Sequence, residues 1–312
     1  MTPRSSLEMP TCAVGIATHN RLTELRRTLE VVAALAPQPE ELLICADGCD
    51  DGTAQYVRER FPGAKLIEHA RPQGSIRSRI ELMHAAASDV VISLDDDSYP
   101  MESDFIARVR ELFARRPRVA VASFPQRTDE YPETLAVESF GPSRYVGNYI
   151  NAAAAFRRSV YLEVEGWPPE FEHAYDESDY TLQCLAAGYA VYYETGITIR
   201  HHYTGLMRNE MRTHHRHARN EQWSAWRRCP FPSVAWVSIY RALSQLNYAR
   251  KRGPGWIVRE PRWWWMALRG LPSALRKRDP VPARIYREWL RLTRQPIATE
   301  QEWEAAFLGG KD

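Results

Sequence analysis

Three consecutive aspartates, Asp95, Asp96 and Asp97, follow directly on the apolar run VVISL at residues 90–94. In an extended chain the side chains of Asp95 and Asp97 point to one side and that of Asp96 to the other. Two carboxylates on one face are unfavourable unless a cation lies between them, and their oxygens suit Mg²⁺ or Mn²⁺. The triplet therefore indicates a divalent-metal site. The alternative is a solvated acidic turn in which Asp97 or Ser98 caps the next helix.

Polar residues also follow other apolar runs. Thr18, His19 and Asn20 come at the end of the run that starts at Cys12, and Asp47 ends the next one. Such runs alternate with amphipathic helical patterns, which is typical of βαβ units and a mainly parallel sheet. Because ligands bind outside the carboxyl ends of the strands in these sheets, the polar residues predict one site at one edge.

The expected elements continue this alternation. Strands are predicted at 12–18, 41–47, 64–70, 89–95 and 119–125, helices at 21–35, 53–61, 75–87 and 102–116, mainly loop at 126–150, and two short strands within 189–202. Asn20 is the expected N-cap of the first helix. Residues 152–167 predict a strand and then a helix that ends at Gly166, and a further helix begins at Asp176 and ends at Gly188.

Four ordered blocks resemble the family-2 glycosyltransferases, which are inverting enzymes of the GT-A fold. The blocks are VGIATHNR (14–21), ADGCDDGT (46–53), GSIRSRIELMHAAASDVVISLDDD (74–97) and GWPPEFEHAYDESDYTLQCLAAGY (166–189). They are similar to the family patterns PTYNR, DDGSxDGT, ARN followed by LDxD, and GFDExFxxYEDxDLxLRLxxAGY. The resemblance covers residues 12 to about 202 and implies transfer of a sugar from a nucleoside-diphosphate sugar to a hydroxyl group.

The resemblance also implies a ligand set for the metal. Asp97 should ligate the ion, and Asp95 should contact the ion or the ribose of the donor. A histidine often closes the metal site in this family, and the spacing selects His201 rather than His202. Since imidazole joins two carboxylates in this set, Mn²⁺ is favoured over Mg²⁺.

Further residues are implied in binding the nucleotide sugar. They are Thr18, His19, Asn20, Asp47, Arg79, Asp95 and Asp96. Arg79 would stabilise the diphosphate, and Asp47 would accept a hydrogen bond from an N–H of uracil, thymine or guanine. His19 stands where the family usually has tyrosine. Asp50 and Asp51 are expected to be turn residues.

Inversion in a single displacement requires a general base beside the acceptor hydroxyl. The Glu–Asp pair of the family is reversed here, with Asp176 at the glutamate position and Glu177 at the aspartate position. Glu177 is the predicted base and Asp176 the second candidate. The structural alternative is a pair of acids that complement a helix N-terminus. Asp179 is expected to be structural or to orient the acceptor.

The chain departs from the family pattern at Ile80, Leu82, Glu165 and Gln183. Most of these positions lie outside the predicted metal site, so we expect altered sugar or acceptor choice and retained catalysis. The Q-x-x-R-W motif of processive relatives is not apparent after residue 179, which favours a non-processive enzyme that adds one sugar.

The chain has 312 residues, of which 44% are hydrophobic and 26% charged, as is ordinary for a globular protein. It has no uncharged apolar segment long enough to span a membrane and no apolar signal core. Its five cysteines are odd in number and contain no C-x-x-C pair, so reduced thiols are expected. We therefore expect a cytoplasmic protein, which could lie peripherally at the inner face of the cell membrane.

Charge divides the chain near residue 203. Residues 1–202 carry 20 Lys and Arg against 30 Asp and Glu, whereas residues 203–312 carry 21 against 9 and hold most of the ten tryptophans. This predicts a catalytic domain at 1–202, with a nucleotide-sugar half at about 12–125 and an acceptor half at about 126–202, and a helical basic extension at 203–312.

Three interpretations of the extension remain open. Its arginines and tryptophans could dock on anionic lipid, where a lipid-linked acceptor would be presented, or bind an anionic glycan acceptor. They could also pack the aromatic side chains onto the catalytic domain and expose arginine to water. His214, His215 and His217 are expected on a solvated polar helix face.

The sequence gives less support to other classes of function. A sugar-1-phosphate nucleotidyltransferase needs a Gly-rich phosphate loop after the first strand, but the chain has ATHNRLTE there. A nucleic-acid binder would place basic residues on the sheet edge, where this chain is acidic. A nucleotide-sugar-binding protein without transfer activity stays open because the pair Asp176–Glu177 is reversed.

Overall fold

The computed structural model describes residues 8–203 and 209–309. An eight-stranded sheet forms the centre of this described part, in the order β3-β2-β1-β4-β9-β6-β10-β8. The strands are β1 (Cys12–Thr18), β2 (Glu41–Asp47), β3 (Lys65–His69), β4 (Val90–Asp95), β6 (Val119–Ser123), β8 (Arg144–Tyr145), β9 (Ala153–Arg157) and β10 (Ala190–Tyr193). Strands β1 to β4 run parallel, and β9 is antiparallel to both β4 and β6. The predicted α/β fold with a mixed sheet is confirmed.

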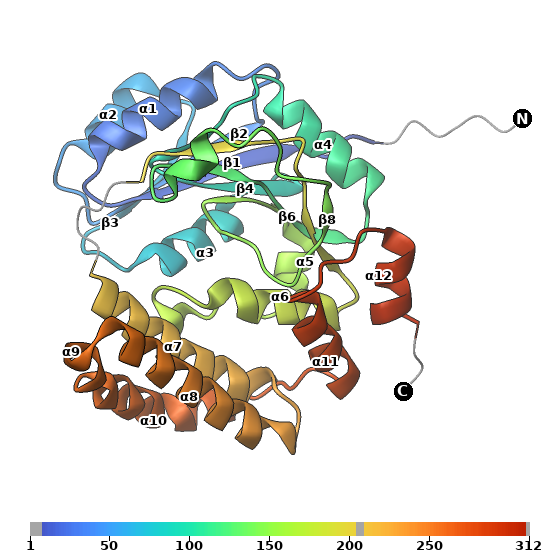
Figure 1. Ribbon diagram of the computed structural model, residues 1–312. Helices are drawn as coiled ribbons and strands as arrows, with labels where there is room; N and C mark the ends of the chain where they lie inside the picture. Colours follow the sequence, from blue (N-terminus) through green and yellow to red (C-terminus); the bar gives the residue numbers. More distant parts are fainter. Residues whose placement is uncertain (1–7, 204–208, 310–312) are drawn as a thin grey trace, which may run out of the picture.

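Helices cover both faces of this sheet (Figure 1). One face carries α1 (Leu22–Ala33), α2 (Thr53–Arg60) and α4 (Phe105–Arg115), and the other carries α3 (Ser75–Ala85), α5 (Arg158–Glu163) and α6 (Asp176–Ala186). Alternation along the strands produces the two layers, since Val14 and Ile92 pack in one hydrophobic cluster and Ala13 and Val91 in the other. Burial on both faces explains the nearly continuous apolar runs of these strands.

A second, three-stranded sheet continues from the aspartate triplet. Its order is β5 (Ser98–Pro100), β11 (Ile199–His201) and β7 (Gln126–Thr128). The antiparallel pairing of β5 with β11 places His201 opposite Ser98. The chain after the triplet is therefore a strand, which the sequence pattern does not predict. The alternative of a helix-capping turn is wrong, because α4 begins only at Phe105.

Several helix ends differ from the prediction, among them the start of α1 and the end of α5. α1 begins at Leu22, and Asn20 has a φ of 51° and does not cap it. The N–H of Leu22 donates to Asp51 Oδ2 at 2.9 Å, so a carboxylate from another loop satisfies this helix end. α5 ends at Glu163, and Gly166, with a φ of 77°, belongs to the turn that follows.

The C-terminal region is helical, as predicted. It contains α7 (Glu210–Arg228), α8 (Ser233–Arg252), α9 (Pro254–Ile257), α10 (Glu260–Arg276), α11 (Ala283–Leu292) and α12 (Glu300–Phe307), and two short 3-10 helices lie earlier at Pro132–Leu135 and Pro169–Phe171. Helices α7, α8 and α10 form a layer on the side of α6 away from the sheet (Figure 1). α7 and α10 pack closely at Gly270, where a side chain would have no room against the Trp223 ring.

α7 buries polar side chains as well as apolar ones. His214 and His215 are buried, and His214 Nε2 lies 2.7 Å from Glu260 Oε1 of α10. The ring of His217 packs against the edge of Tyr175 at 5.3 Å. The expected solvated face is therefore wrong, because α8 and α10 pack along α7 and remove these histidines from water.

The hydrophobic core crosses the predicted domain boundary. Trp303 of α12 is fully buried, and its ring stacks on Tyr145 of β8 at a centroid distance of 5.8 Å. Parts of α11 and α12 share one hydrophobic cluster with the central sheet. The division into 1–202 and 203–312 stays a prediction from composition, and residues 204–208 beside it lie outside the described residues.

Candidate active site

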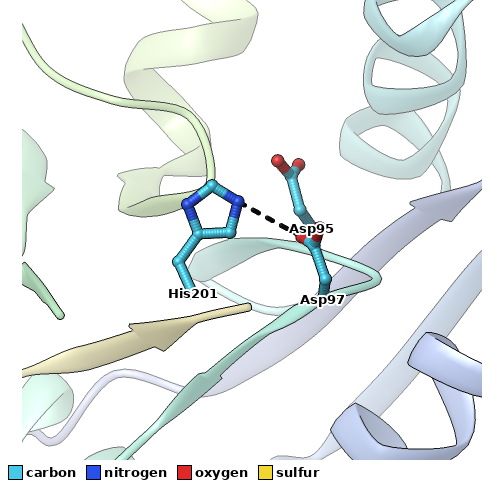
Figure 2. A group of neighbouring side chains, drawn as sticks. All are labelled: Asp95, Asp97 and His201. Atoms are coloured by element: carbon cyan, nitrogen blue, oxygen red, sulfur yellow. Dashed lines mark ion pairs between the residues drawn. The ribbon is translucent and has the colours of Figure 1, made fainter. Parts of the chain in front are cut away.

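Two of the three aspartates meet a histidine from a distant segment. Ligand atoms of Asp95, Asp97 and His201 lie within 4.8 Å of one another, and Figure 2 shows their arrangement. Asp95 ends β4, and the pairing of β5 with β11 brings His201 Nε2 to 3.4 Å from Asp97 Oδ1. The fold thus gathers all three residues that the sequence predicted as metal ligands.

This donor set fits a divalent cation. Asp97 is buried, and its Oδ1 has no hydrogen-bond partner within the described residues. Burial tends to raise the pKa of Asp97, but His201 and Arg21 outweigh it and hold this pKa below its ordinary value. The carboxyl group is therefore ionised, as a metal ligand must be. Two carboxylates with one imidazole are ligands that suit Mn²⁺.

Arginine side chains also offset the repulsion within the triplet. Arg21 Nη1 lies 2.8 Å from Asp96 Oδ1, and its Nη2 lies 2.5 Å from Asp97 Oδ2. Arg79 Nη2 of α3 lies 2.5 Å from Asp95 Oδ1. Sequence reasoning anticipated Arg79 and missed Arg21. The signal was present, because Arg21 ends the VGIATHNR block directly after the predicted donor-binding residues.

Asp96 and Asp97 form a turn after the end of β4, so the predicted strand alternation does not extend through the triplet, and both carboxylates contact Arg21. Asp96 is buried, and its Oδ2 accepts a hydrogen bond from Thr18 Oγ1 at 2.8 Å. Its backbone carbonyl accepts another from Thr28 of α1. Burial raises the pKa of Asp96 to about 7, although Arg21 pairs with it. Asp96 and the equally buried Thr18 thus form a polar layer behind the triplet.

Asp47 organises the loop that leads into α3. Its Oδ1 accepts hydrogen bonds from the Gln73 N–H at 2.7 Å and from His69 Nδ1 at 2.6 Å, and its Oδ2 accepts one from the Gly74 N–H at 2.8 Å. Burial tends to raise the pKa of Asp47, but these hydrogen bonds outweigh it and lower the pKa. Oδ2 keeps a lone pair for a further donor.

His69 is a second site residue that sequence reasoning missed. It ends β3, so the rule applied to the other strand ends would have found it. Its second ring nitrogen, Nε2, lies 2.9 Å from Glu81 Oε2. Burial tends to lower the pKa of His69, but the carboxylates of Glu81 and Asp47 outweigh it and raise the pKa above its ordinary value. Both ring nitrogens face carboxylates, which is the pattern of a protonated imidazole.

We expect the pH dependence of stability to change when His69 is replaced by glutamine. Because the pKa of His69 is raised in the folded state, its stabilising contribution is complete below the unfolded-state pKa and is lost as the pH rises through the folded-state value. Denaturant unfolding between about pH 6 and 9 should therefore show a smaller loss of stability with rising pH in His69→Gln than in wild type. The exposed His84→Gln is the control, and parallel wild-type and His69→Gln curves would contradict the assignment.

His19 and Asn20 connect the first two strand ends. His19 Nδ1 donates to the backbone carbonyl of Asp47 at 2.6 Å, and Asn20 Oδ1 accepts from the Asp50 N–H at 2.9 Å. Both residues are half-buried. The carboxylate of Asp51 accepts from Thr53 and Leu22, in agreement with a turn residue. These contacts hold the β1 and β2 loops together at the edge of the sheet.

Asp176 and Glu177 begin α6 close to the predicted donor residues. Burial tends to lower the pKa of Arg79, but Asp95, Asp176 and Glu177 outweigh it and raise the pKa. Arg79 therefore pairs with Asp95 and lies within electrostatic reach of the acid pair.

The two acids of the pair differ in their surroundings. Asp176 is buried, and its Oδ2 accepts a hydrogen bond from Asn151 Nδ2 at 2.6 Å. Glu177 is more exposed. Burial of its carboxyl group, and then the neighbouring charge of Asp176, raise the pKa of Glu177 well above its ordinary value, against the effect of Arg79. A carboxylate whose pKa is raised is a better proton acceptor.

The backbone before the acid pair is strained. Glu172, Ala174 and Tyr175 have φ values of 62°, 72° and 68°, which are uncommon for residues other than glycine. Asn220 of α7 is fully buried, and its Nδ2 donates to three backbone carbonyl groups of this segment at 2.8 to 3.0 Å. The C-terminal layer therefore holds the turn from which Asp176 emerges.

His173 lies in the same turn and was also missed. It interacts electrostatically with Asp176, Arg79 and Asp95. Desolvation lowers the pKa of His173 below its ordinary value although Asp176 opposes the shift, so the imidazole is neutral near pH 7. The only signal in the sequence was its place within the block that ends in the acid pair.

The mixed sheet covered by helices, with an acidic cluster at its strand ends, has the GT-A fold. Residues 13–165 match the model of glycosyl transferase family 2. The chain is a glycosyltransferase with a family-2 domain, as its sequence blocks predicted.

Solved structures agree with this fold. The mannosyltransferase PcManGT from Pyrobaculum calidifontis, in complex with GDP-Man and Mn²⁺, is 18% identical, with coverage of 96% of this chain and 86% of that one and a TM-score of 0.56. TarS 1–349 from S. aureus, in complex with UDP-GlcNAc, is 13% identical, with coverage of 88% and 82% and a TM-score of 0.63. GalNAc-T7 with UDP, GalNAc and Mn²⁺ is 14% identical, with coverage of 75% and 54% and a TM-score of 0.54.

No curated protein matched the chain. Among the described residues, no helix combines the length and the apolar character needed to cross a membrane.

Proposed function

We propose that the protein is an inverting, non-processive glycosyltransferase that moves a sugar from a nucleoside-diphosphate sugar to a hydroxyl group of a glycan, lipid-linked or other acceptor. The observation that carries the proposal is the Asp95–Asp97–His201 cluster, in which Arg79 pairs with Asp95 and lies within electrostatic reach of the Asp176–Glu177 pair. A donor diphosphate held at the cluster would lie near a cationic side chain, with a carboxylate base within the same site.

Asp95, Asp97 and His201 would hold Mn²⁺ or Mg²⁺. The bound ion would offset the negative charge that develops on the leaving diphosphate. Complexes of PcManGT and GalNAc-T7 that contain Mn²⁺ support this assignment. The guanidinium of Arg79 would add a second positive charge beside the diphosphate.

We assign the nucleoside to the loops around Asp47, His19 and Asn20. The remaining lone pair of Asp47 Oδ2 would accept an N–H of the base, and the half-buried His19 and Asn20 would line the pocket. Thr18 and Asp96 are buried and bonded to each other, so we assign them to support of the triplet and not to direct contact with the donor.

In the proposed step the acceptor oxygen attacks the anomeric carbon as the bond from that carbon to the diphosphate oxygen breaks. The acceptor proton passes to a carboxylate, and the nucleoside diphosphate leaves with the electron pair. Glu177 is our first candidate for this base because its pKa is raised, and Asp176 is the second because a hydrogen bond from Asn151 already occupies one of its oxygens.

Replacement of Glu177 by glutamine tests this role. With Mn²⁺ and a panel that includes GDP-mannose and UDP-GlcNAc, we expect Glu177→Gln to retain the donor-induced rise in Tm of wild type but to lose turnover by about 10²- to 10⁴-fold, as removal of a general base requires.

Asp176→Asn and the surface variant Glu163→Gln complete the set. Loss of activity in Asp176→Asn alone would transfer the base to Asp176. If wild type binds a donor with Mn²⁺ but shows no turnover with any acceptor, the chain is a nucleotide-sugar-binding protein. Absence of any donor-induced rise in Tm would contradict the proposed function itself.

A further inference from the structure

Two helices that flank α7, together with the residue Val258 before α10, expose large apolar side chains. Six of them are Trp236, Tyr240 and Leu243 of α8, Val258, and Trp265 and Leu268 of α10, each 59 to 75% exposed. We call these six residues the α8–α10 surface. Clusters of exposed apolar side chains of this size on several neighbouring elements mark an interaction site.

The apolar residues of α8 lie on one stripe. Trp236, Tyr240 and Leu243 are spaced by four and three positions and therefore share a helix face. Val234, Arg241 and Ala249 are buried on the opposite face. α8 thus presents an apolar stripe to solvent in addition to the face that packs on the protein.

The exposed charges within residues 233–276 are all positive. Residues 233–276 contain one acidic residue, Glu260, which is fully buried between His214 and Trp263. The exposed basic residues of this range are Arg250, Lys251, Arg252, Arg259, Arg262, Arg269 and Arg276. Arg252 is paired with Glu210 of α7, at 3.4 Å. The surface therefore offers tryptophan and aliphatic side chains next to a strong positive potential.

Exposed apolar side chains next to positive charge favour one class of partner over the others. A second copy of the chain would bring two basic surfaces into contact, which costs free energy without acidic partners. A nucleic acid would use the arginines and aromatic rings but would leave Leu243, Val258 and Leu268 unexplained. An anionic bilayer uses all of them, because tryptophan and leucine side chains enter the interface while arginine pairs with lipid phosphate.

We propose that the α8–α10 surface docks on anionic lipid, with α8 and α10 lying along the membrane interface. The layer lies on the side of α6 away from the sheet, so docking would leave the central sheet outside the contact (Figure 1). The proposal does not depend on the transfer chemistry, because lipid binding needs neither donor nor metal.

Vesicle flotation of the full chain, without metal or donor, tests the proposal. Binding is expected to vesicles of equal parts phosphatidylcholine and phosphatidylglycerol at low salt, with weak binding to pure phosphatidylcholine. The paired change Arg262→Glu with Arg269→Glu should weaken binding about tenfold or more, and Trp236→Ser with Leu243→Gln should have a similar effect. Tyr131→Ser, at an exposed tyrosine far from this surface, is the matched control and should bind as wild type.

A second measurement keeps the test independent of how well the variants fold. In wild type, a quencher attached to the lipid should reduce tryptophan fluorescence upon addition of anionic vesicles. The proposal is overturned if wild type stays unbound at low salt, or if both paired variants fold and bind as wild type. It is also overturned if wild type is a dimer that does not bind vesicles and Trp236→Ser with Leu243→Gln makes it a monomer. The partner of this surface would then be a second copy of the chain.

Discussion

Replacement of Asp97 by alanine is expected to abolish metal-dependent turnover of a nucleotide sugar while the protein stays folded. Asp97 is buried, as is His201, and Asp97 Oδ1 lies 3.4 Å from Nε2 of His201 (Figure 2). Loss of this ligand should weaken Mn²⁺ binding and reduce turnover by at least about a hundredfold.

Isothermal titration with Mn²⁺ alone separates metal binding from catalysis. Asp97→Asn keeps the shape of the side chain and removes its charge, so it should show the same loss as Asp97→Ala. Asp104→Asn, at an exposed ion pair with Arg108, is the control and should titrate as wild type. Because Arg21 keeps its contact with Asp96, Asp97→Ala should unfold cooperatively. Unchanged turnover in a folded Asp97→Ala protein would refute the metal assignment.

Replacement of Arg228 by methionine should destabilise the protein more than any surface change. Arg228 of α7 is almost completely buried, and its Nη2 lies 3.2 Å from Oδ2 of the fully buried Asp179 of α6. It also pairs with Glu165. Among the described residues, its removal leaves the buried Asp179 charge with side-chain hydrogen bonds from Gln183 and Ser224 alone, so we expect a loss of about 3–5 kcal/mol in the free energy of unfolding.

Denaturant unfolding measures this loss. Arg291→Met removes an exposed arginine that pairs with Glu288 within one helix, and it should cost less than about 0.5 kcal/mol. In a double-mutant cycle, Asp179→Asn in the Arg228→Met background should cost much less than in wild type, because the unpaired charge is then removed. A loss below about 1 kcal/mol in Arg228→Met would show that the ion pair is not a structural link.

The contact between Arg228 and Asp179 also bears on the interpretation of the C-terminal region, because it buries an arginine that was expected to face water. The packing interpretation of the extension expected aromatic side chains inside and arginine outside. Trp263 and Trp303 are indeed buried, but Arg227 and Arg228 are buried with them, and Trp236 is exposed. The number of tryptophans and arginines follows from the sequence, but it does not show which of them are buried. An arginine is buried where its helix face packs against an acid such as Asp179.

Most of the main sheet could be predicted because its strands are locally determined. VVISL and similar runs are apolar on both faces, and each is separated from the next by an amphipathic helix, so the period alone indicates βαβ units. Asp95 and Asp97 do lie close together, but the expected reason was wrong, because the chain turns at Asp96 and Asp97 instead of staying extended. The start of α1 at Leu22 could not be predicted from the sequence, because the N–H of Leu22 donates to Asp51, a residue from a different loop.

By itself, the sequence determined that this chain forms an α/β fold with acidic residues at the strand ends, that a family-2 pattern runs through its first two thirds, and that positive charge and tryptophan gather in the remainder. Only the tertiary structure decided that β5 pairs with β11 and brings His201 to Asp97. It alone placed Arg79 against Asp95 and within electrostatic reach of the acid pair, and Asn220 against the strained turn. The physical reason is range: periodicity and strand ends are set by neighbouring residues, whereas these contacts join segments that meet only after the sheet has formed.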